Sequence, residues 1–250
     1  NLNRSAACWV QARIESSNEY DGIVRGLVFI PGLYFLVYDT LPQSELTRDL
    51  SYGIQLSPGS KVSTRATSLS GNTQGSLWDI TASPGLSLAP VLEGSTDPVG
   101  GWVSTSYGNL LAAPQARFRS DKSQPTTAFV IRVANQTASG DNLSIDVLSS
   151  SNGSHAFRIS CGESIDYLIL HPLGKADAKD CWGIDFDGDL LWIRTRHSRV
   201  QKLRWLDGRS VKCQDMCLRV EAALPLSILE LEANQPGNSL ADSLNHCQLG

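Results

Sequence analysis

The sequence predicts an all-β protein, a multi-stranded antiparallel β-sandwich built from large stacked sheets. Nearly every apolar segment is short, rich in β-branched or aromatic side chains, and bounded by Gly, Pro, Asn, Asp or Ser. Such segments are typical of strands joined by turns, and here they recur about every eight to fifteen residues. Amphipathic helical stripes are nearly absent, the best being residues 240–249. Strands that follow one another without intervening helices favour stacked sheets.

The first clear element is a hairpin around Pro31-Gly32, which separates the apolar runs 26–30 and 33–39. Pro followed by Gly is a turn signal because Pro presets φ and Gly tolerates a positive φ. The second run ends on an acid, Asp39. Asp39 is either a functional carboxylate at a domain interface or a structural acid that accepts hydrogen bonds from turn amides or from Arg25. The structural interpretation is favoured because buried charges persist mainly when they are paired.

Other turns and loops follow from composition. Asp187-Gly188 and Asp207-Gly208 each lie between two apolar runs, which is the sequence chemistry of a two-residue hairpin turn. Residues 93–113 are rich in Gly, Ser and Pro and interrupt the strand rhythm. They form either a long loop or a boundary between two sheets, and we expect a loop inside one β unit. The expected organisation is a single β-sandwich domain over residues 1–250.

Composition and charge exclude several classes of function. The chain is 41% hydrophobic with a net charge of -4, so no global basic character indicates a nucleic-acid partner. No apolar run approaches the roughly 18 residues of a membrane span. Cys213 and Cys217 either face each other across a tight hairpin as a disulfide or remain thiols. The opening residues lack an initiating Met and a signal-peptide layout, so we expect a segment of a longer chain.

A series of landmarks begins with Arg25 ahead of a strand and with the aromatic strand that ends on Asp39. The later landmarks, in order, are residues 52–62, 100–118, 126–133, 164–174, 187–196 and 203–211. Together they resemble the C-terminal β-sandwich region of the heparinase II/III-like polysaccharide lyases. Each motif is weak by itself, but their order and spacing span nearly the whole chain.

The resemblance implies a partner domain and a chemistry. In that family an N-terminal α/α toroid packs on the sandwich, an acidic polysaccharide such as a glycosaminoglycan or alginate lies between them, and a uronate undergoes β-elimination. Most catalytic groups belong to the toroid, so this chain is expected to support the cleft and to be inactive alone, in a periplasmic, secreted or cell-surface protein. The alternative is a non-catalytic protein on the same scaffold that binds glycan or serves cell-surface polysaccharide assembly.

The resemblance also raises the question of a metal, because some relatives hold a structural ion through His residues and the strand-end Asp. Here Gly22, Ile23, Ile54 and Gln55 stand where such His partners would be expected. Divalent ions need several ligands. The sequence therefore predicts no cofactor, no metal site at Asp39 and no catalytic residue from this chain.

Arginines are the first candidates for contact with an acidic polymer. Strand alternation would place Arg194, Arg196 and Ser198 on one face, with Arg199 close behind. Guanidinium groups match carboxylate and sulfate oxygens. The alternative is the solvated face of a hairpin, where charged side chains prevent an edge strand from pairing with another chain.

Three aromatic residues complete the candidates. Trp102 and Tyr107 lie in a Gly-rich segment and could stack on sugar rings. Tyr20 is the one ionisable group near the position of the missing His that could serve in acid–base work, although a core or surface tyrosine is the more common role for such a residue.

Overall fold

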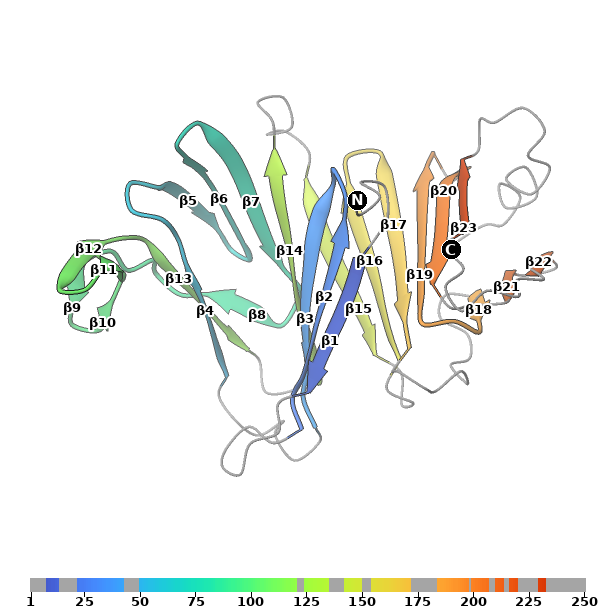
Figure 1. The fold of residues 1–250 in the computed structure, drawn as a ribbon, viewed down its shortest axis with the longest axis horizontal. Helices are drawn as coiled ribbons and strands as arrows, with labels where there is room; N and C mark the ends of the chain where they lie inside the picture. The colour runs from blue at the N-terminus through green and yellow to red at the C-terminus, as the bar shows by residue number, and fades with distance from the viewer. Residues whose placement is uncertain are drawn as a thin grey trace. The chain divides into compact units, whose positions relative to one another are not determined.

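The computed structural model shows the all-β architecture that the sequence predicts (Figure 1). The structure describes residues 8–13, 22–42, 50–120, 124–134, 142–149, 154–171, 184–197, 199–206, 210–213, 216–219 and 229–232. Within these ranges all strands pair antiparallel and no α-helix occurs, so no helix there could cross a membrane. The chain divides into two compact units, Cys8–Asp141 and Asn142–Gly250 with Asn1–Ala7. The expectation of one domain stays a prediction, and each unit is described by itself.

The first unit is a sandwich of unequal sheets. Its seven-stranded sheet has the order β1-β2-β3-β14-β7-β6-β5, and its three-stranded sheet has the order β4-β13-β8. The bounds in the larger sheet are β1 Cys8–Arg13, β2 Val24–Ile30, β3 Tyr34–Thr40, β14 Thr126–Ala134, β7 Ser76–Ala82, β6 Ser68–Thr73 and β5 Lys61–Arg65. The bounds in the smaller sheet are β4 Ser51–Gln55, β13 Gln115–Ser120 and β8 Leu86–Leu88.

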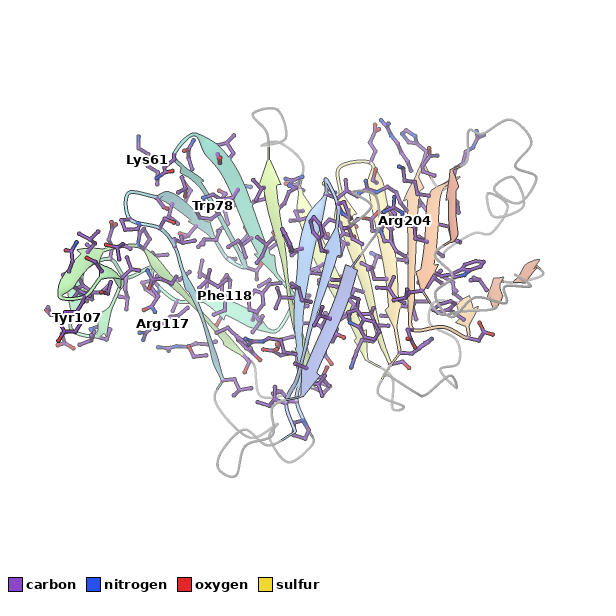
Figure 2. All side chains as sticks on the ribbon, viewed as in Figure 1. Lys61, Trp78, Tyr107, Arg117, Phe118 and Arg204 are labelled. Carbon is purple, nitrogen blue, oxygen red and sulfur yellow. The ribbon has the colours of Figure 1, made fainter. Side chains whose placement is uncertain are left out.

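The core of the first unit lies between these two sheets. Figure 2 shows Trp78 of β7 and Phe118 of β13 in this layer. The Phe118 ring meets Phe129 of β14 edge to face, with centroids 5.1 Å apart. Only the half of the large sheet formed by β14, β7, β6 and β5 contributes strand side chains to this core.

The hairpin predicted at Pro31-Gly32 is confirmed. β2 and β3 pair from Val24 opposite Thr40 to Ile30 opposite Tyr34. Gly32 has a φ of 75°, and the Leu33 amide donates to the Ile30 carbonyl at 3.0 Å. Pro at the second and Gly at the third turn position therefore supply the backbone angles that this turn needs.

A steric constraint explains why residue 26 of β2 is a glycine. It lies directly opposite Tyr38 of β3, and a Cβ atom at Gly26 would fall 2.1 Å from the Tyr38 ring. The ring is buried, and burial raises the pKa of Tyr38 to about 12. Because Gly26 has no side chain, the buried Tyr38 ring can lie over the backbone of β2.

The prediction of a loop over residues 93–113 is wrong. This segment forms two small hairpins, β9 (Ser95–Thr96) with β10 (Val99–Gly100) and β11 (Trp102–Ser106) with β12 (Asn109–Ala112). The Gly101 carbonyl accepts from the amides of Gly94 and Ala113, both at 2.8 Å, which joins the hairpins at their base. Glycines that suggested a loop instead allow this close backbone contact.

The second unit also pairs a larger with a smaller sheet. The six-stranded sheet has the order β15-β16-β17-β19-β20-β23, and the three-stranded sheet has the order β18-β21-β22. The bounds are β15 Leu143–Ser149, β16 His155–Cys161, β17 Ser164–Leu170, β19 Leu190–Arg196, β20 Arg199–Leu206, β23 Leu229–Glu232, β18 Ile184–Phe186, β21 Ser210–Cys213 and β22 Met216–Arg219. Buried side chains from both sheets form one cluster, which includes Tyr167, Trp205 and Phe186.

The prediction of a hairpin at Asp187-Gly188 is wrong. The strands on either side of it, β18 and β19, belong to different sheets. β18 pairs with β21 instead, through Ile184 opposite Cys213. The Asp-Gly pair therefore marks the point where the chain passes between sheets. Residues 207–209 and 240–249 lie outside the described residues, as do the side chains of Cys213 and Cys217.

We expect Gly26→Ala to destabilise the first unit by about 2–4 kcal/mol, because the added methyl group would force the buried Tyr38 ring out of place. Urea-induced unfolding followed by circular dichroism measures this loss. The matched control is Gly53→Ala in β4, where the nearest atom to an added Cβ is 4.0 Å away. Equal unfolding midpoints for the two variants would contradict the steric explanation.

Candidate functional site

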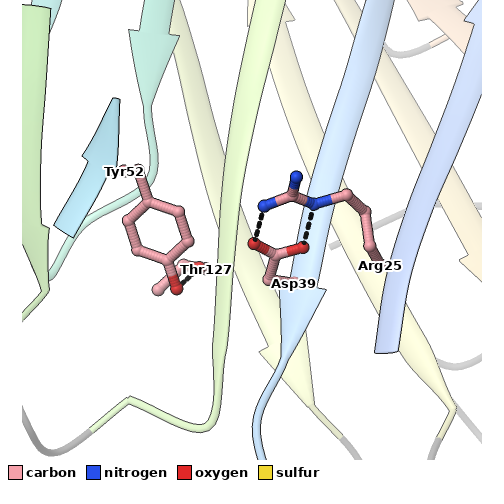
Figure 3. A network of polar contacts seen from close by, with 4 residues as sticks. All are labelled: Arg25, Asp39, Tyr52 and Thr127. Atoms are coloured by element: carbon pink, nitrogen blue, oxygen red, sulfur yellow. Dashed lines mark hydrogen bonds and ion pairs between the residues drawn. The ribbon is translucent and has the colours of Figure 1, made fainter. Parts of the chain in front are cut away.

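A polar cluster on the large sheet of the first unit contains the two residues singled out in the sequence. Arg25 of β2 lies directly opposite Asp39 of β3, and Thr127 of β14 lies opposite Asp39 on its other side. The Arg25 guanidinium donates through Nε to Oδ1 and through Nη2 to Oδ2 of Asp39, both at 2.7 Å (Figure 3). Both carboxylate oxygens therefore accept from one planar fork.

The two charges differ in their exposure. The Asp39 side chain is 6% exposed and the Arg25 side chain 56%. The hydrogen bond to Asp39 raises the pKa of Arg25 and outweighs the opposite effect of burial. Arg25 thus neutralises a nearly buried acid while its side chain stays open to solvent. This is the paired arrangement that the sequence favoured for Asp39.

Tyr52 of β4 brings a hydroxyl to the same cluster. Thr127 Oγ1 donates to the Tyr52 hydroxyl oxygen at 2.9 Å. Burial raises the pKa of Tyr52, and the Asp39 charge adds to this effect. Tyr52 is therefore neutral near pH 7. It suits hydrogen-bond donation better than the removal of a proton.

The cluster does not fit a metal ion. Both Asp39 oxygens already accept from Arg25. Gln55, at one position where a His would be expected, donates to the carbonyls of Ala113 and Pro114 at 3.3 and 3.2 Å. Ile54 packs against the core. Within the described ranges, no group of His, Cys, Asp or Glu side chains is arranged to hold a metal.

Two of the three candidate arginines of the second unit are bound to acids. Arg194 donates through Nε and Nη2 to the buried Asp166, at 2.7 and 3.0 Å. Arg196 donates to Glu163 at 3.0 and 2.5 Å, and both side chains are exposed. That contact lowers the pKa of Glu163. The predicted ridge is therefore partly neutralised.

Arg199, exposed at the start of β20, differs from the other two because no acid among the described residues is paired with it. The β19–β20 ladder shifts register between Arg194 and Thr195 because β20 carries one extra residue there, while β19 keeps a regular pairing with β17, so Arg194 and Arg196 lie on one face. Ser198 lies outside the described residues. Of the three arginines, Arg199 is the one that the structure leaves best placed to contact an external anion.

The aromatic candidates take different roles. The Trp102 indole nitrogen donates to the Ser95 carbonyl at 2.9 Å, which ties the two small hairpins together. Tyr107 is fully exposed in the turn between β11 and β12 (Figure 2). Tyr107 can therefore stack on a ligand, whereas Trp102 mainly stabilises the contact between the two hairpins. Tyr20 lies outside the described residues.

The sequence reasoning missed a stacked group on β19 and β20. The buried Trp192 ring has the Arg194 guanidinium 5.9 Å and the Arg204 guanidinium 5.3 Å from its centroid. Arg204 lies directly opposite Trp192 in the ladder. The Trp-x-Arg spacing in β19 was a signal for one of these contacts, but the other required the strand register.

A second missed group is a pair of buried histidines in the second unit. The Phe186 carbonyl can only accept, so His171 Nε2 donates to it, at 3.0 Å. The other ring nitrogen, Nδ1, then accepts from the Ser154 hydroxyl at 3.0 Å. Burial and the neighbouring His171 lower the pKa of His155 to about 4.

Comparison with known proteins gives structural neighbours only. No protein-family model matches the sequence, and no curated protein matches it significantly. Similar solved structures include two of heparinase III, one with methylated lysines, at TM-scores of 0.46 and 0.44 and identities of 12% and 13% over 72% and 70% of this chain. A mutant heparan sulfate lyase from Pedobacter heparinus has a TM-score of 0.47 and 19% identity over 65% of the chain.

This chain spans about a quarter of the length of those structures, 24%, 23% and 28% respectively. All three TM-scores are below 0.5. The functional proposal below therefore rests on the chain's own residues.

We expect Arg25→Met to destabilise the first unit by about 2 kcal/mol, because it leaves the buried Asp39 carboxylate without its cation. Urea-induced unfolding at pH 7 measures the change. The matched control is Arg119→Met on β13 of the same unit, an exposed position where the expected effect is within about 0.5 kcal/mol. Equal losses in the two variants would show that Asp39 does not depend on Arg25.

We expect the stability of the second unit to fall as the pH drops from about 6.5 towards 4. The folded-state pKa of His155 lies below the unfolded value of about 6.5, so its contribution is full above that value and is lost on protonation. The loss is on the order of 3 kcal/mol. Unfolding of the wild type and of His155→Gln across this range measures it. Identical pH dependences would refute the assignment to His155.

Proposed function

We propose that this chain is the β-sandwich part of a polysaccharide lyase resembling the heparinase II/III-like enzymes, and that it supports the substrate cleft without cleaving by itself. The proposal draws on the ordered sequence landmarks that begin with Arg25 and Asp39. In the structure these two residues join neighbouring strands of a large sheet. Such a scaffold can hold one wall of a cleft rigidly.

The observation that carries the supporting role is the state of the ionisable groups in the polar cluster. β-Elimination on a uronate needs a base for the C5 proton, a group that neutralises the sugar carboxylate and an acid for the leaving oxygen. Asp39 is held by Arg25, and the pKa of Tyr52 is raised by burial. Neither is suited to remove a proton near pH 7. In this proposal the base therefore comes from another part of the protein.

The substrate class in this proposal is an acidic polysaccharide that contains uronate. Arg25 and Arg199 are exposed, and guanidinium groups bind carboxylate and sulfate oxygens well. The partner in this proposal is an N-terminal helical toroid of the same polypeptide. Such polymers occur outside the cytoplasm, which supports a periplasmic, secreted or cell-surface location.

Glycan binding without elimination is the second candidate function. Tyr107 favours it, because this ring is fully exposed on a pair of hairpins that backbone hydrogen bonds and the Trp102 indole hold together. An exposed aromatic face on a rigid support is suited to packing on a pyranose ring. This function would need no partner domain.

We expect the 250-residue chain to produce no unsaturated uronate from heparin, hyaluronan or alginate, as measured by ultraviolet absorbance. The polypeptide that includes the residues encoded ahead of Asn1 should cleave at least one of them. Cleavage by the 250-residue chain, or none by the longer polypeptide, would overturn the proposal. In the second case, binding of a polymer that Tyr107→Ala weakens and Val99→Ala does not would support the glycan-binding function.

A further inference from the structure

The outer face of the three-stranded sheet in the first unit carries two arginines among small polar residues. Neighbouring side chains of a strand point to opposite faces, so Arg117 faces outward where Phe118 faces the core (Figure 2). We call this surface the outer strip, and its members are Ser51, Gly53 and Gln55 of β4, Gln115, Arg117 and Arg119 of β13, and Ser87 of β8. All of them are exposed or partly exposed.

The two arginines of the outer strip depart from the pairing that the other strands show. Four other arginines in the described strands lie directly opposite an aspartate and bind it. Gly53 lies directly opposite Arg117, and Ser51 and Ser87 lie on the two sides of Arg119. Neither arginine is paired with an acid among the described residues. The outer strip therefore holds two positive charges that no described aspartate or glutamate neutralises.

Arg117 is held in place by neutral acceptors. Its Nη2 atom donates to the Val99 carbonyl at 3.2 Å and to Gln115 Oε1 at 3.1 Å. These contacts fix the guanidinium without cancelling its charge. Strand geometry puts Arg119 about 7 Å further along the same face. Two guanidinium groups at this spacing can each bind a carboxylate or sulfate group of one polymer.

Gly53 gives an independent indication that a ligand comes close to the sheet. Glycine weakens the interior of a strand, and it often marks a place where a ligand approaches the backbone. At Gly26 and Gly71 an added Cβ atom would overlap with an aromatic side chain, so the fold itself requires glycine there. At Gly53 the nearest atom to an added Cβ is 4.0 Å away, and φ is not positive. The fold does not require glycine at this position, directly opposite Arg117.

The other groups of the outer strip suit a sugar polymer. The hydroxyls of Ser51 and Ser87 and the side chain of Gln55 are exposed and can exchange hydrogen bonds with sugar hydroxyls. The outer strip has no aromatic ring, whereas proteins that bind single-stranded nucleic acids use aromatic rings as stacking platforms. The net charge of -4 also disfavours the dense charge of a nucleic acid.

We propose that the outer strip is a binding site for an acidic polysaccharide, in which Arg117 and Arg119 bind anionic groups of the polymer and a sugar ring lies against the backbone at Gly53. The class of polymer rests on the proposed function. The position of the site rests on the residues of the outer strip alone.

Binding of heparin and of alginate to the 250-residue chain, measured by isothermal titration calorimetry, tests the proposal. Arg117→Gln and Arg119→Gln should each weaken binding on the order of tenfold, because each removes a charge-assisted contact. The matched control is Arg65→Gln, which removes the same charge from an exposed position on β5 of the other sheet and should leave the affinity unchanged. Equal losses in all three variants, or no binding of either polymer, would overturn the proposal.

Gly53→Val separates binding from folding. A β-branched residue suits an exposed strand position, so the urea midpoint should stay the same or rise. Binding should nevertheless weaken by a factor similar to that of the arginine variants, because the new side chain would keep the sugar ring away from β4. Ser63→Val, at an exposed position of β5, is the control and should retain full binding. Wild-type affinity in Gly53→Val would contradict the proposed contact.

Two further outcomes separate this proposal from its alternatives. Double-stranded DNA that binds as tightly as heparin through the same two arginines would make the outer strip a general polyanion site and overturn the assignment to a polysaccharide. Elimination activity of the polypeptide that includes the residues ahead of Asn1 separates the two proposals. Activity with binding that the arginine variants leave intact overturns only the outer strip, and binding that those variants weaken without any activity overturns only the lyase assignment.

Discussion

Arginine and aspartate side chains lie directly opposite each other in neighbouring strands, and the buried pairs among them oppose any slip of the strand register. Four such pairs occur among the described strands: Arg25 with Asp39, Arg132 with Asp79, Arg158 with Asp146, and Arg194 with Asp166. A slip of one residue would move every side chain of a strand to the other face. It would also leave the nearly buried acids Asp39 and Asp166 without their cations, at a cost of several kcal/mol.

This constraint explains why the two halves of the large sheet of the first unit differ in burial. With the register held, one row of side chains on β14 meets the core, and the equivalent rows on β2 and β3 include the exposed Leu27 and Phe35. The polar cluster of Arg25, Asp39 and Tyr52 lies at the boundary between the half of the large sheet that the three-stranded sheet covers and the half that it leaves open. Its charges hold the strands together, so the cluster is better suited to support a surface than to perform proton transfer.

Local patterns predicted the elements whose causes are local. The strand-rich fold followed from short β-branched runs between turn residues, and the Pro31-Gly32 hairpin followed from two backbone preferences. Arg25 was named, beside turn amides, as a possible partner of Asp39 because buried charges persist mainly when they are paired, and the strand register places the two opposite each other. The same reasoning failed at Asp187-Gly188, because an Asp-Gly pair indicates a turn but does not say which strands will pair.

The sequence by itself determined that the chain forms antiparallel sheets and where its first hairpin turns, and it favoured a paired Asp39, since these depend on residues close along the chain. Only the tertiary structure decided that Arg194 is bound to Asp166, 28 positions away, and that Tyr52 joins the cluster through Thr127. It also decided which half of the large sheet stays open. Burial and charge pairing between distant strands are set by sheet order and register, which short sequence patterns do not encode.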